Sequence, residues 1–156
     1  MKSSIFTKTT TICGHQFQYS DSFEFYIDKN GNPIEALEGF RENARNKLKD
    51  LRGEFVYIYY FENISVNITT SDSFIYIGRS KSNKQKTFER FMHEIYEDNR
   101  GKDKAKQYTL THFYEKCIRM RLEVFFVEDC CEVERTLLHK HKVAFGYLPI
   151  ANGKEG

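Results

Sequence analysis

The sequence predicts an α+β fold in which a small, mostly antiparallel sheet of three strands is flanked by helices and preceded by an extension with further strands and a helix. Residues 55–59 and 74–77 are aromatic and β-branched, which favours strands. Asn, Ser, Thr and Asp dominate the residues between them, so the two segments are expected to pair as a long antiparallel hairpin. The near-continuous apolar run over 122–127 has strand length and predicts a central strand.

The chain of 156 residues suits one domain with an addition, and we assign residues 1–53 to an N-terminal extension and 54–156 to the main domain. Strands are expected within 5–27. Asn32 before Pro33 is typical of a helix N-terminus, because asparagine caps free N–H groups and proline fits the first turn. The apolar stripe of this helix consists of Leu37, Phe40, Ala44 and Leu48. Its basic residues lie mostly off that stripe: Arg41, Arg45, Lys47 and Lys49.

Gly78 is predicted to end the second strand of the hairpin, since glycine lets the backbone turn away. A helix is expected over 87–96, where apolar residues recur at helical spacing. Arg90 falls almost opposite that apolar stripe, with His93 and Glu94 on either side of it. A charged loop over 98–106 and helices over 109–119 and 132–142 complete the expected order.

Charge is concentrated in one region of a chain whose net charge is only +2. Residues 79–106 contain nine Lys or Arg and five Asp or Glu, an excess of four positive charges. Such a concentration suits a polyanion, and a solvated basic surface is the plainer alternative. The four cysteines form no CxxC pair and are expected to be free, buried thiols: Cys13, Cys117, Cys130 and Cys131. The polar start of the chain and the absence of a long apolar run favour a cytoplasmic protein without membrane contact.

Glu134 is the first candidate for chemistry. Leu137 and Leu138 set the apolar direction of the last helix, and Glu134 falls within that arc. An ionised carboxylate that points at a core costs several kcal/mol unless it is paired or binds a metal. Glu134 therefore either reaches water at the edge of the helix or has a partner inside.

Tyr57 and Tyr76 on the hairpin are the next candidates. A tyrosine acts as a base only if nearby cations or a metal lower its pKa from about 10. Arg79, Lys81 and Arg90 are the cations that could do so. The alternative is that the tyrosines are ordinary core residues of a sheet and that Arg90 is a solvated charge.

Five pieces of sequence, in this order, resemble the GIY-YIG nuclease superfamily. Phe55-Val56-Tyr57 is similar to the first half of the name-giving motif, and Tyr76-Ile77-Gly78 is its second half. Arg90 resembles the catalytic arginine of the first helix, and Glu134 the metal-binding glutamate of a later helix. Pro149-Ile150-Ala151-Asn152 resembles the terminal P-x-x-N. The resemblance spans 55–152 and leaves the extension uncovered.

The resemblance implies a phosphodiester hydrolase. Glu134, a substrate phosphate and waters would hold one Mg²⁺ or Mn²⁺. Tyr57 would take a proton from the attacking water, Tyr76 would position or relay, and Arg90 would neutralise charge on the transition state. The family often has His or Tyr four residues after the arginine. Here that residue is Glu94, and His93 comes one residue earlier.

The implied substrate is double-stranded DNA, and a small restriction-type endonuclease is the form of enzyme expected, as a monomer or a homodimer. Residues expected to contact the nucleic acid are Arg79, Lys81, Lys84, Lys86 and Asn152. The extension either adds base contacts or completes the packing. Two alternatives belong to other classes: a binding module with this fold but no activity, and an α+β interaction domain in which the tyrosines are core and Glu134 lies far from Arg90.

Overall fold

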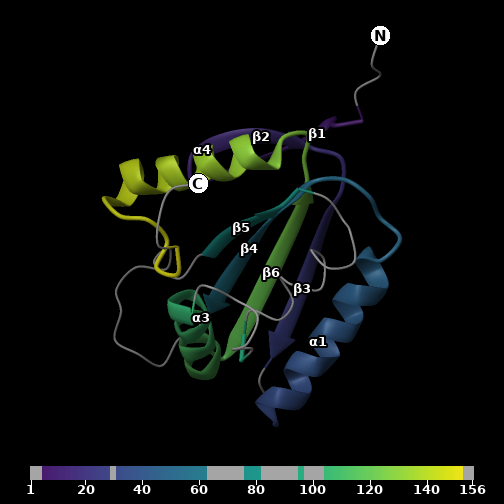
Figure 1. Ribbon diagram of the computed structural model, residues 1–156, viewed down its shortest axis with the longest axis vertical. Coiled ribbons are helices and arrows are strands. Elements are labelled where there is room, and N and C mark those ends of the chain that lie inside the picture. The colour runs from purple at the N-terminus through teal and green to yellow at the C-terminus, as the bar shows by residue number, and fades with distance from the viewer. Residues whose placement is uncertain (1–4, 29–30, 63–75, 82–94, 97–103, 153–156) are drawn as a thin grey trace.

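The computed structural model describes residues 5–28, 31–62, 76–81, 95–96 and 104–152 (Figure 1). Its elements are β1 (Lys8–Ile12), β2 (His15–Tyr19), β3 (Ser22–Asp28), α1 (Pro33–Leu48), β4 (Phe55–Glu62), β5 (Tyr76–Ser80), α3 (Lys104–Lys116), β6 (Arg119–Phe126) and α4 (Cys130–Phe145). The expected α+β class is confirmed.

The central sheet has four strands in the order β3-β6-β4-β5, and every neighbouring pair is antiparallel. The predicted hairpin is present as β4 and β5, and the apolar run except its last residue, Val127, lies in β6, inside the sheet. The expected three-stranded core is not confirmed, because β3 pairs with β6 over all seven of its residues. The extension thus shares a sheet with the main domain, while β1 and β2 form a separate two-stranded sheet.

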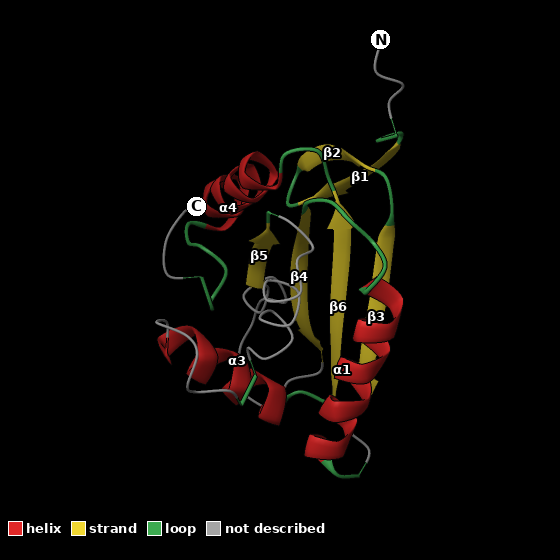
Figure 2. Cartoon of the chain, turned by 45° about the vertical axis from the view of Figure 1, so that its right-hand side comes forward, coloured by secondary structure: helices red, strands yellow, loops and turns green. Residues whose placement is uncertain are grey.

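Alternate side chains of β4 divide the core into two layers, because successive residues of a strand point to opposite faces. Tyr57 and Tyr59 face α1 and α3, whereas Val56 and Ile58 face α4 and the β1–β2 hairpin. Figure 2 shows α4 and the β1–β2 hairpin around one end of the sheet, with α1 and α3 toward the other end. We name the two sides of the sheet the α1/α3 face and the α4 face.

Helix α1 begins as the sequence predicts. The Asn32 side chain accepts hydrogen bonds from the backbone N–H groups of Ile34 and Glu35, over 2.9 and 3.2 Å, and Pro33 occupies the first turn. The predicted apolar stripe is buried: Leu37, Phe40, Ala44 and Leu48. Local capping and periodicity were sufficient to place this helix.

Arg41 was predicted to lie off the apolar stripe of α1, but the structure buries it. Only 7% of the residue is exposed, and its Nη2 donates to the backbone oxygen of buried Ile95 over 2.9 Å. Glu38, one turn earlier, pairs with the same guanidinium. A long side chain can bury its stem and still reach an acceptor, which a periodicity argument does not capture.

Replacing Arg41 by methionine is expected to lower the free energy of unfolding by about 1–3 kcal/mol, because the Ile95 carbonyl loses its charged donor inside the protein. Urea unfolding followed by circular dichroism measures the change. Lys47→Met, which removes an exposed charge from the same helix, is the matched control and should lower the free energy of unfolding by only about a few tenths of a kcal/mol. Equal stability of the two variants would contradict a structural role for Arg41.

Two boundaries downstream differ from the prediction. Helix α3 begins at Lys104, so the last part of the expected charged loop is helical, and Arg119 belongs to β6 rather than to a helix. Alternating burial along β6 explains the second difference, since this strand presents charged residues on one face. The helix expected over 87–96 falls almost entirely outside the described residues. Ile95 and Tyr96 are described as a bend, and Tyr96 has φ +68°.

All four cysteines are free thiols, as expected. Cys117 and Cys130 are buried as predicted, whereas the predicted burial is wrong for Cys13 and Cys131, which are partly exposed. No helix within the described ranges is both long enough and apolar enough to cross a lipid bilayer.

Candidate active site

Strand β5 forms one edge of the central sheet, and the C-terminal segment crosses this edge. Leu148 packs on the α4 face, whereas Ala151 belongs to the core of the α1/α3 face. Asn152 completes the crossing: its Oδ1 accepts from the Ile77 N–H over 3.0 Å, and its Nδ2 donates to the Ile77 oxygen over 2.9 Å. The Asn152 amide thus pairs with the free backbone of an edge strand, and its contact with nucleic acid stays a prediction.

Tyr57 and Tyr76 come together on the α1/α3 face of this edge. Their ring centroids are 6.1 Å apart, and the two residues are only 5% and 8% exposed. Tyr57 is directly opposite Gly78 in the β4–β5 register. A Cβ at Gly78 would lie 2.4 Å from Cζ and 2.6 Å from the hydroxyl oxygen of Tyr57, so the ring extends from β4 across β5 toward the edge.

The reason predicted for Gly78 was wrong. It does not end the strand, since β5 continues to Ser80. The glycine is needed because the Tyr57 ring occupies the space that any side chain would take.

Glu134 has a partner inside the protein, which resolves the alternative that the sequence left open. Asp129 caps α4 by accepting from the Glu132 N–H over 3.1 Å, and the helix places Glu134 against β5, where 9% of the residue is exposed. The Nη1 of Arg79 donates to Glu134 Oε1 over 2.8 Å. Arg79 is next to Gly78 and therefore points to the α4 face.

Burial raises the pKa of Glu134 above the usual value for a carboxylic acid. The Arg79 guanidinium is the largest opposing influence, and Arg135 and Lys106 also favour the ionised carboxylate. Glu134 is thus a carboxylate that remains partly desolvated although three cations lie near it. A bound divalent cation would also offset the free-energy cost of burying this ionised carboxylate.

Lys106 on α3 is the residue that sequence reasoning missed. Its Nζ lies 5.4 Å from the centroid of the Tyr76 ring, and the same ammonium acts on Glu134. The sequence had shown it only as one member of the basic region. No local pattern could reveal its position, because α3 and β5 meet only in the folded chain.

Six residues therefore gather around β5, and we call them the β5-edge cluster: Tyr57, Tyr76, Arg79, Lys106, Glu134 and Asn152. The two tyrosines and Lys106 approach from the α1/α3 face, and Arg79 and Glu134 from the α4 face. Arg90, His93, Lys84 and Lys86 lie outside the described residues, so their predicted roles are unaffected by this geometry.

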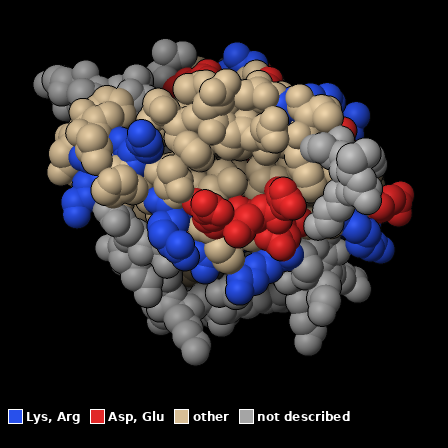
Figure 3. All heavy atoms as spheres, turned by 90° about the horizontal axis from the view of Figure 1, so that it is seen from above, with Lys and Arg blue, Asp and Glu red and all other residues tan. Residues whose placement is uncertain are grey.

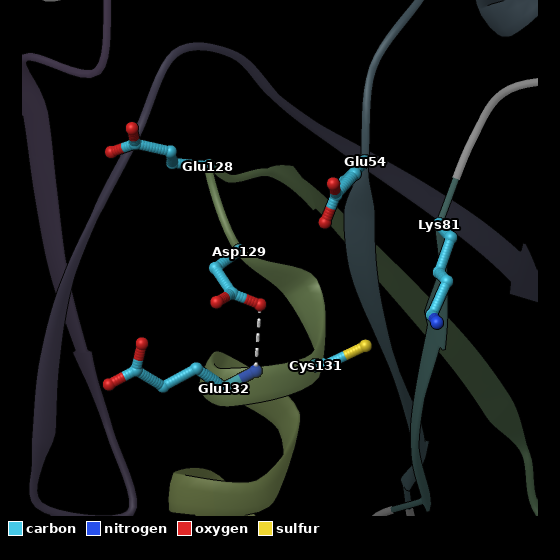
Figure 4. A pocket seen from close by; sticks show the side chains of 6 residues that line it. All are labelled: Glu54, Lys81, Glu128, Asp129, Cys131 and Glu132. Atoms are coloured by element: carbon cyan, nitrogen blue, oxygen red, sulfur yellow. Dashed lines mark hydrogen bonds between the residues drawn. The ribbon is translucent and has the colours of Figure 1, made fainter.

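A second polar feature, a hollow of about 560 Å³, lies at the start of α4. Its lining consists of Glu54, Lys81, Glu128, Asp129, Cys131 and Glu132 (Figure 4). Two of its carboxylates are occupied by the helix N-terminus: Glu54 accepts from the Cys130 N–H over 3.0 Å, and Asp129 caps α4. Figure 4 shows Glu128 and Glu132 pointing away from Glu54, so the carboxylates do not converge.

This acidic hollow is unsuited to a phosphate. Figure 3, which views the molecule from the end that carries α4 and the hairpin, shows acidic side chains gathered in the middle with Lys and Arg around them. Lys81, predicted to contact nucleic acid, lines the hollow and offsets its negative charge. Like charges repel a polyanion, so a DNA backbone would approach the basic border rather than the hollow.

The donor set at the β5 edge fits magnesium or manganese better than zinc. Within the described ranges no group of three His, Cys, Asp or Glu side chains converges as a metal cage would. A single carboxylate is sufficient for Mg²⁺ when phosphate oxygens and waters complete the octahedron, whereas zinc sites usually need three or four protein ligands. Glu134 is the one carboxylate of the β5-edge cluster.

Comparisons of the chain with models of protein families, with curated proteins and with solved structures found no match.

Proposed function

We propose that this chain is a divalent-metal-dependent endonuclease of the GIY-YIG type that hydrolyses phosphodiester bonds of double-stranded DNA in the cytoplasm. One observation carries the proposal: the carboxylate of Glu134, bound to Arg79, is buried against β5 on the α4 face, and Tyr57 and Tyr76 meet at the same edge strand on the α1/α3 face. Active sites typically bring together buried ionisable side chains of different kinds, here a carboxylate, an arginine and two tyrosines. The motif order of the sequence supports the same conclusion.

In this proposal the metal ion supplies Lewis acidity at the scissile phosphate. Glu134 would hold the ion when it is bound, with the substrate phosphate and waters as its other ligands. Tyr57 accepts a proton from the attacking water, which requires that the cations of the edge stabilise its ionised form. Tyr76, in contact with the Tyr57 ring, keeps that ring in place.

In this proposal Arg79 and Arg90 interact with the substrate phosphate. An arginine bound to Glu134 has a phosphate oxygen as its natural alternative partner, because the guanidinium fork matches both groups. Arg90 is proposed to neutralise the charge of the transition state, and His93 to assist from the same side of its helix. Residues 1–53 would add recognition contacts, as in a restriction-type enzyme.

Plasmid cleavage tests the proposal directly. Supercoiled DNA is incubated with the protein in Mg²⁺, in Mn²⁺ and in EDTA. We expect nicked or linear DNA only with metal, no product from Glu134→Ala, and near wild-type cleavage by Glu132→Ala, which removes an exposed carboxylate from the same helix. Cleavage that persists in EDTA, or in Glu134→Ala, would refute the proposal.

A binding module without activity is the second candidate, and the Arg79–Glu134 pair favours it, since a carboxylate that already has a cation needs no metal. Salt-sensitive retention of DNA in a gel-shift assay, without cleavage in either metal, would establish this alternative.

A further inference from the structure

The β1–β2 hairpin is a narrow ribbon of two strands with two different sides. Its turn consists of Cys13 and Gly14, whose φ angles of +53° and +76° are both positive, as the common two-residue hairpin turn requires. Because side chains alternate along each strand, every second cross-strand pair faces the same way. One side of the hairpin packs on the core of the α4 face through Ile12, Phe17 and Tyr19.

The opposite side, which we call the outer side of the hairpin, presents uncharged side chains that form hydrogen bonds. Its two cross-strand pairs are Thr9 with Gln18 and Thr11 with Gln16, and all four residues are exposed. Glutamine forms two hydrogen bonds with the major-groove edge of adenine, and a threonine methyl group contacts the methyl group of thymine. The outer side therefore has the chemistry that distinguishes A·T from G·C pairs.

The charge and width of the hairpin suit the major groove of DNA. Residues 1–20 contain two lysines and no Asp or Glu, so this segment has no carboxylate side chain to repel a polyanion. Lys8 pairs with Asp21 over 3.9 Å, but both side chains stay 58% exposed, and such surface pairs are weak. The major groove is about 12 Å wide and admits a two-stranded ribbon.

The hairpin lies on the same face of the sheet as Glu134. Strands β2 and β5 both pack against α4, the helix that carries Glu134 (Figure 1). Helix α4 has 16 residues and is therefore about 24 Å long, the length of about seven base pairs, so one duplex can reach both the hairpin and the β5 edge. Helix α1, the other main element of the extension, instead packs on β3, at the opposite edge of the sheet.

We propose that the outer side of the β1–β2 hairpin enters the major groove of the DNA substrate and reads A·T pairs there. Gln16 and Gln18 donate to and accept from adenine, and Thr9 and Thr11 contact thymine methyl groups. This inference rests on the proposed function for its ligand and deepens it, since that proposal assigns recognition to residues 1–53 as a whole.

Selection from a library of duplexes with a random central segment measures sequence preference apart from chemistry. The library is enriched in EDTA by the wild type, Gln16→Ala, Gln18→Ala, Gln16→Arg and Asn46→Ala. Asn46 has an exposed amide on α1, so its replacement is the matched control. Sequencing the ends of plasmid fragments cut in Mg²⁺ gives the preference from cleavage, and fluorescence anisotropy compares the preferred duplex with a shuffled one.

We expect the wild type to prefer a site with one A·T pair for each glutamine. Gln16→Ala and Gln18→Ala should each lose one of these positions, and the ratio of affinities for the preferred and the shuffled duplex should fall by about 5- to 150-fold. The slope of log Kobs against log salt should stay the same, because neither glutamine carries a charge. Asn46→Ala should match the wild type.

Gln16→Arg provides a result that a loss of stability cannot produce. Arginine forms its two hydrogen bonds with guanine, so this variant should prefer G·C at the position where the wild type prefers A·T. The other position, read by Gln18, should be unchanged.

A wild type that cuts all sequences equally would overturn the inference and leave the proposed function intact, as would Gln16 and Gln18 variants that keep the wild-type preference. A wild type that binds a preferred site through these glutamines but never cuts would refute the proposed activity and support the inference. A wild type that neither binds nor cuts DNA would refute both.

Discussion

Glu134→Gln is expected to abolish metal-dependent cleavage while the protein stays folded and becomes slightly more stable at neutral pH. Loss of the proposed metal ligand should remove several kcal/mol of transition-state stabilisation, which is about 10³-fold in rate. The amide oxygen of glutamine still accepts from Arg79, so the contact between α4 and β5 is kept. The desolvated charge is gone, which should raise the free energy of unfolding by an amount on the order of 1 kcal/mol.

The stability difference between Glu134→Gln and the wild type should depend on pH, and its direction follows from the pKa of Glu134. The folded protein holds a proton on Glu134 more tightly than the unfolded chain does, because burial raises its pKa. Between the ordinary value and the raised value the folded state binds more protons, so its stability decreases as pH rises through this window. The stability difference between Glu134→Gln and the wild type should be zero at acidic pH below both values and grow as pH rises through the window.

Chemical denaturation at a series of pH values measures the difference, and the variant Glu132→Gln, with an exposed carboxylate, should show no such growth. Metal binding provides a second readout, because a protonated carboxyl does not bind Mg²⁺. Cleavage and metal affinity should therefore fall, as pH is lowered, at a higher pH than for an ordinary glutamate. A Glu134→Gln variant that loses stability and retains cleavage would contradict both parts.

Local signals in the sequence were sufficient for most elements. The cap at Asn32 and the turn-rich residues before Tyr76 act within a few positions along the chain, and these predicted the start of α1 and the hairpin. The direction of Glu134 on its helix is also a local property. Helical periodicity placed Glu134 within the apolar arc of its helix but left open whether the carboxylate reaches water, and it could not show that Arg79 meets it.

The features that the sequence could not show depend on contacts between distant segments. Strand β3 pairs with β6 across more than half of the chain, so it was assigned to an extension rather than to the central sheet. Lys106 and Arg41 are ordinary surface residues by sequence, and only tertiary packing brings one to Tyr76 and the other to the Ile95 carbonyl. Gly78 was correctly singled out, but for a turn rather than for the ring that covers it.

Gly78→Ala is expected to destabilise the protein and to displace the proposed base at the same time. The new methyl carbon would meet three atoms of the Tyr57 side chain at 2.4–2.8 Å, closer than a real contact allows. The ring has little room to yield, because Tyr57 is 5% exposed and lies between the rings of Phe55, Tyr59 and Tyr76. Overpacking of this kind costs about 1–3 kcal/mol.

Gly39→Ala is the matched control, since a Cβ there meets nothing within 4 Å and the position lies inside α1. That change should stabilise the protein by about 0.5–1 kcal/mol, as glycine is a poor helix former. Urea unfolding of the two variants should therefore give shifts of opposite sign. Cleavage should be unchanged in Gly39→Ala and strongly reduced in Gly78→Ala under conditions in which both are folded.

A double-mutant cycle shows whether the cost at Gly78 comes from the Tyr57 ring. Tyr57→Ala removes the ring and leaves space for the methyl group, so Gly78→Ala should cost much less in that background than in the wild type. Both Tyr57→Ala proteins should be inactive, because the proposed base is absent. An equal cost of Gly78→Ala in the two backgrounds would mean that the glycine serves the backbone of β5, and that the position of Tyr57 does not depend on it.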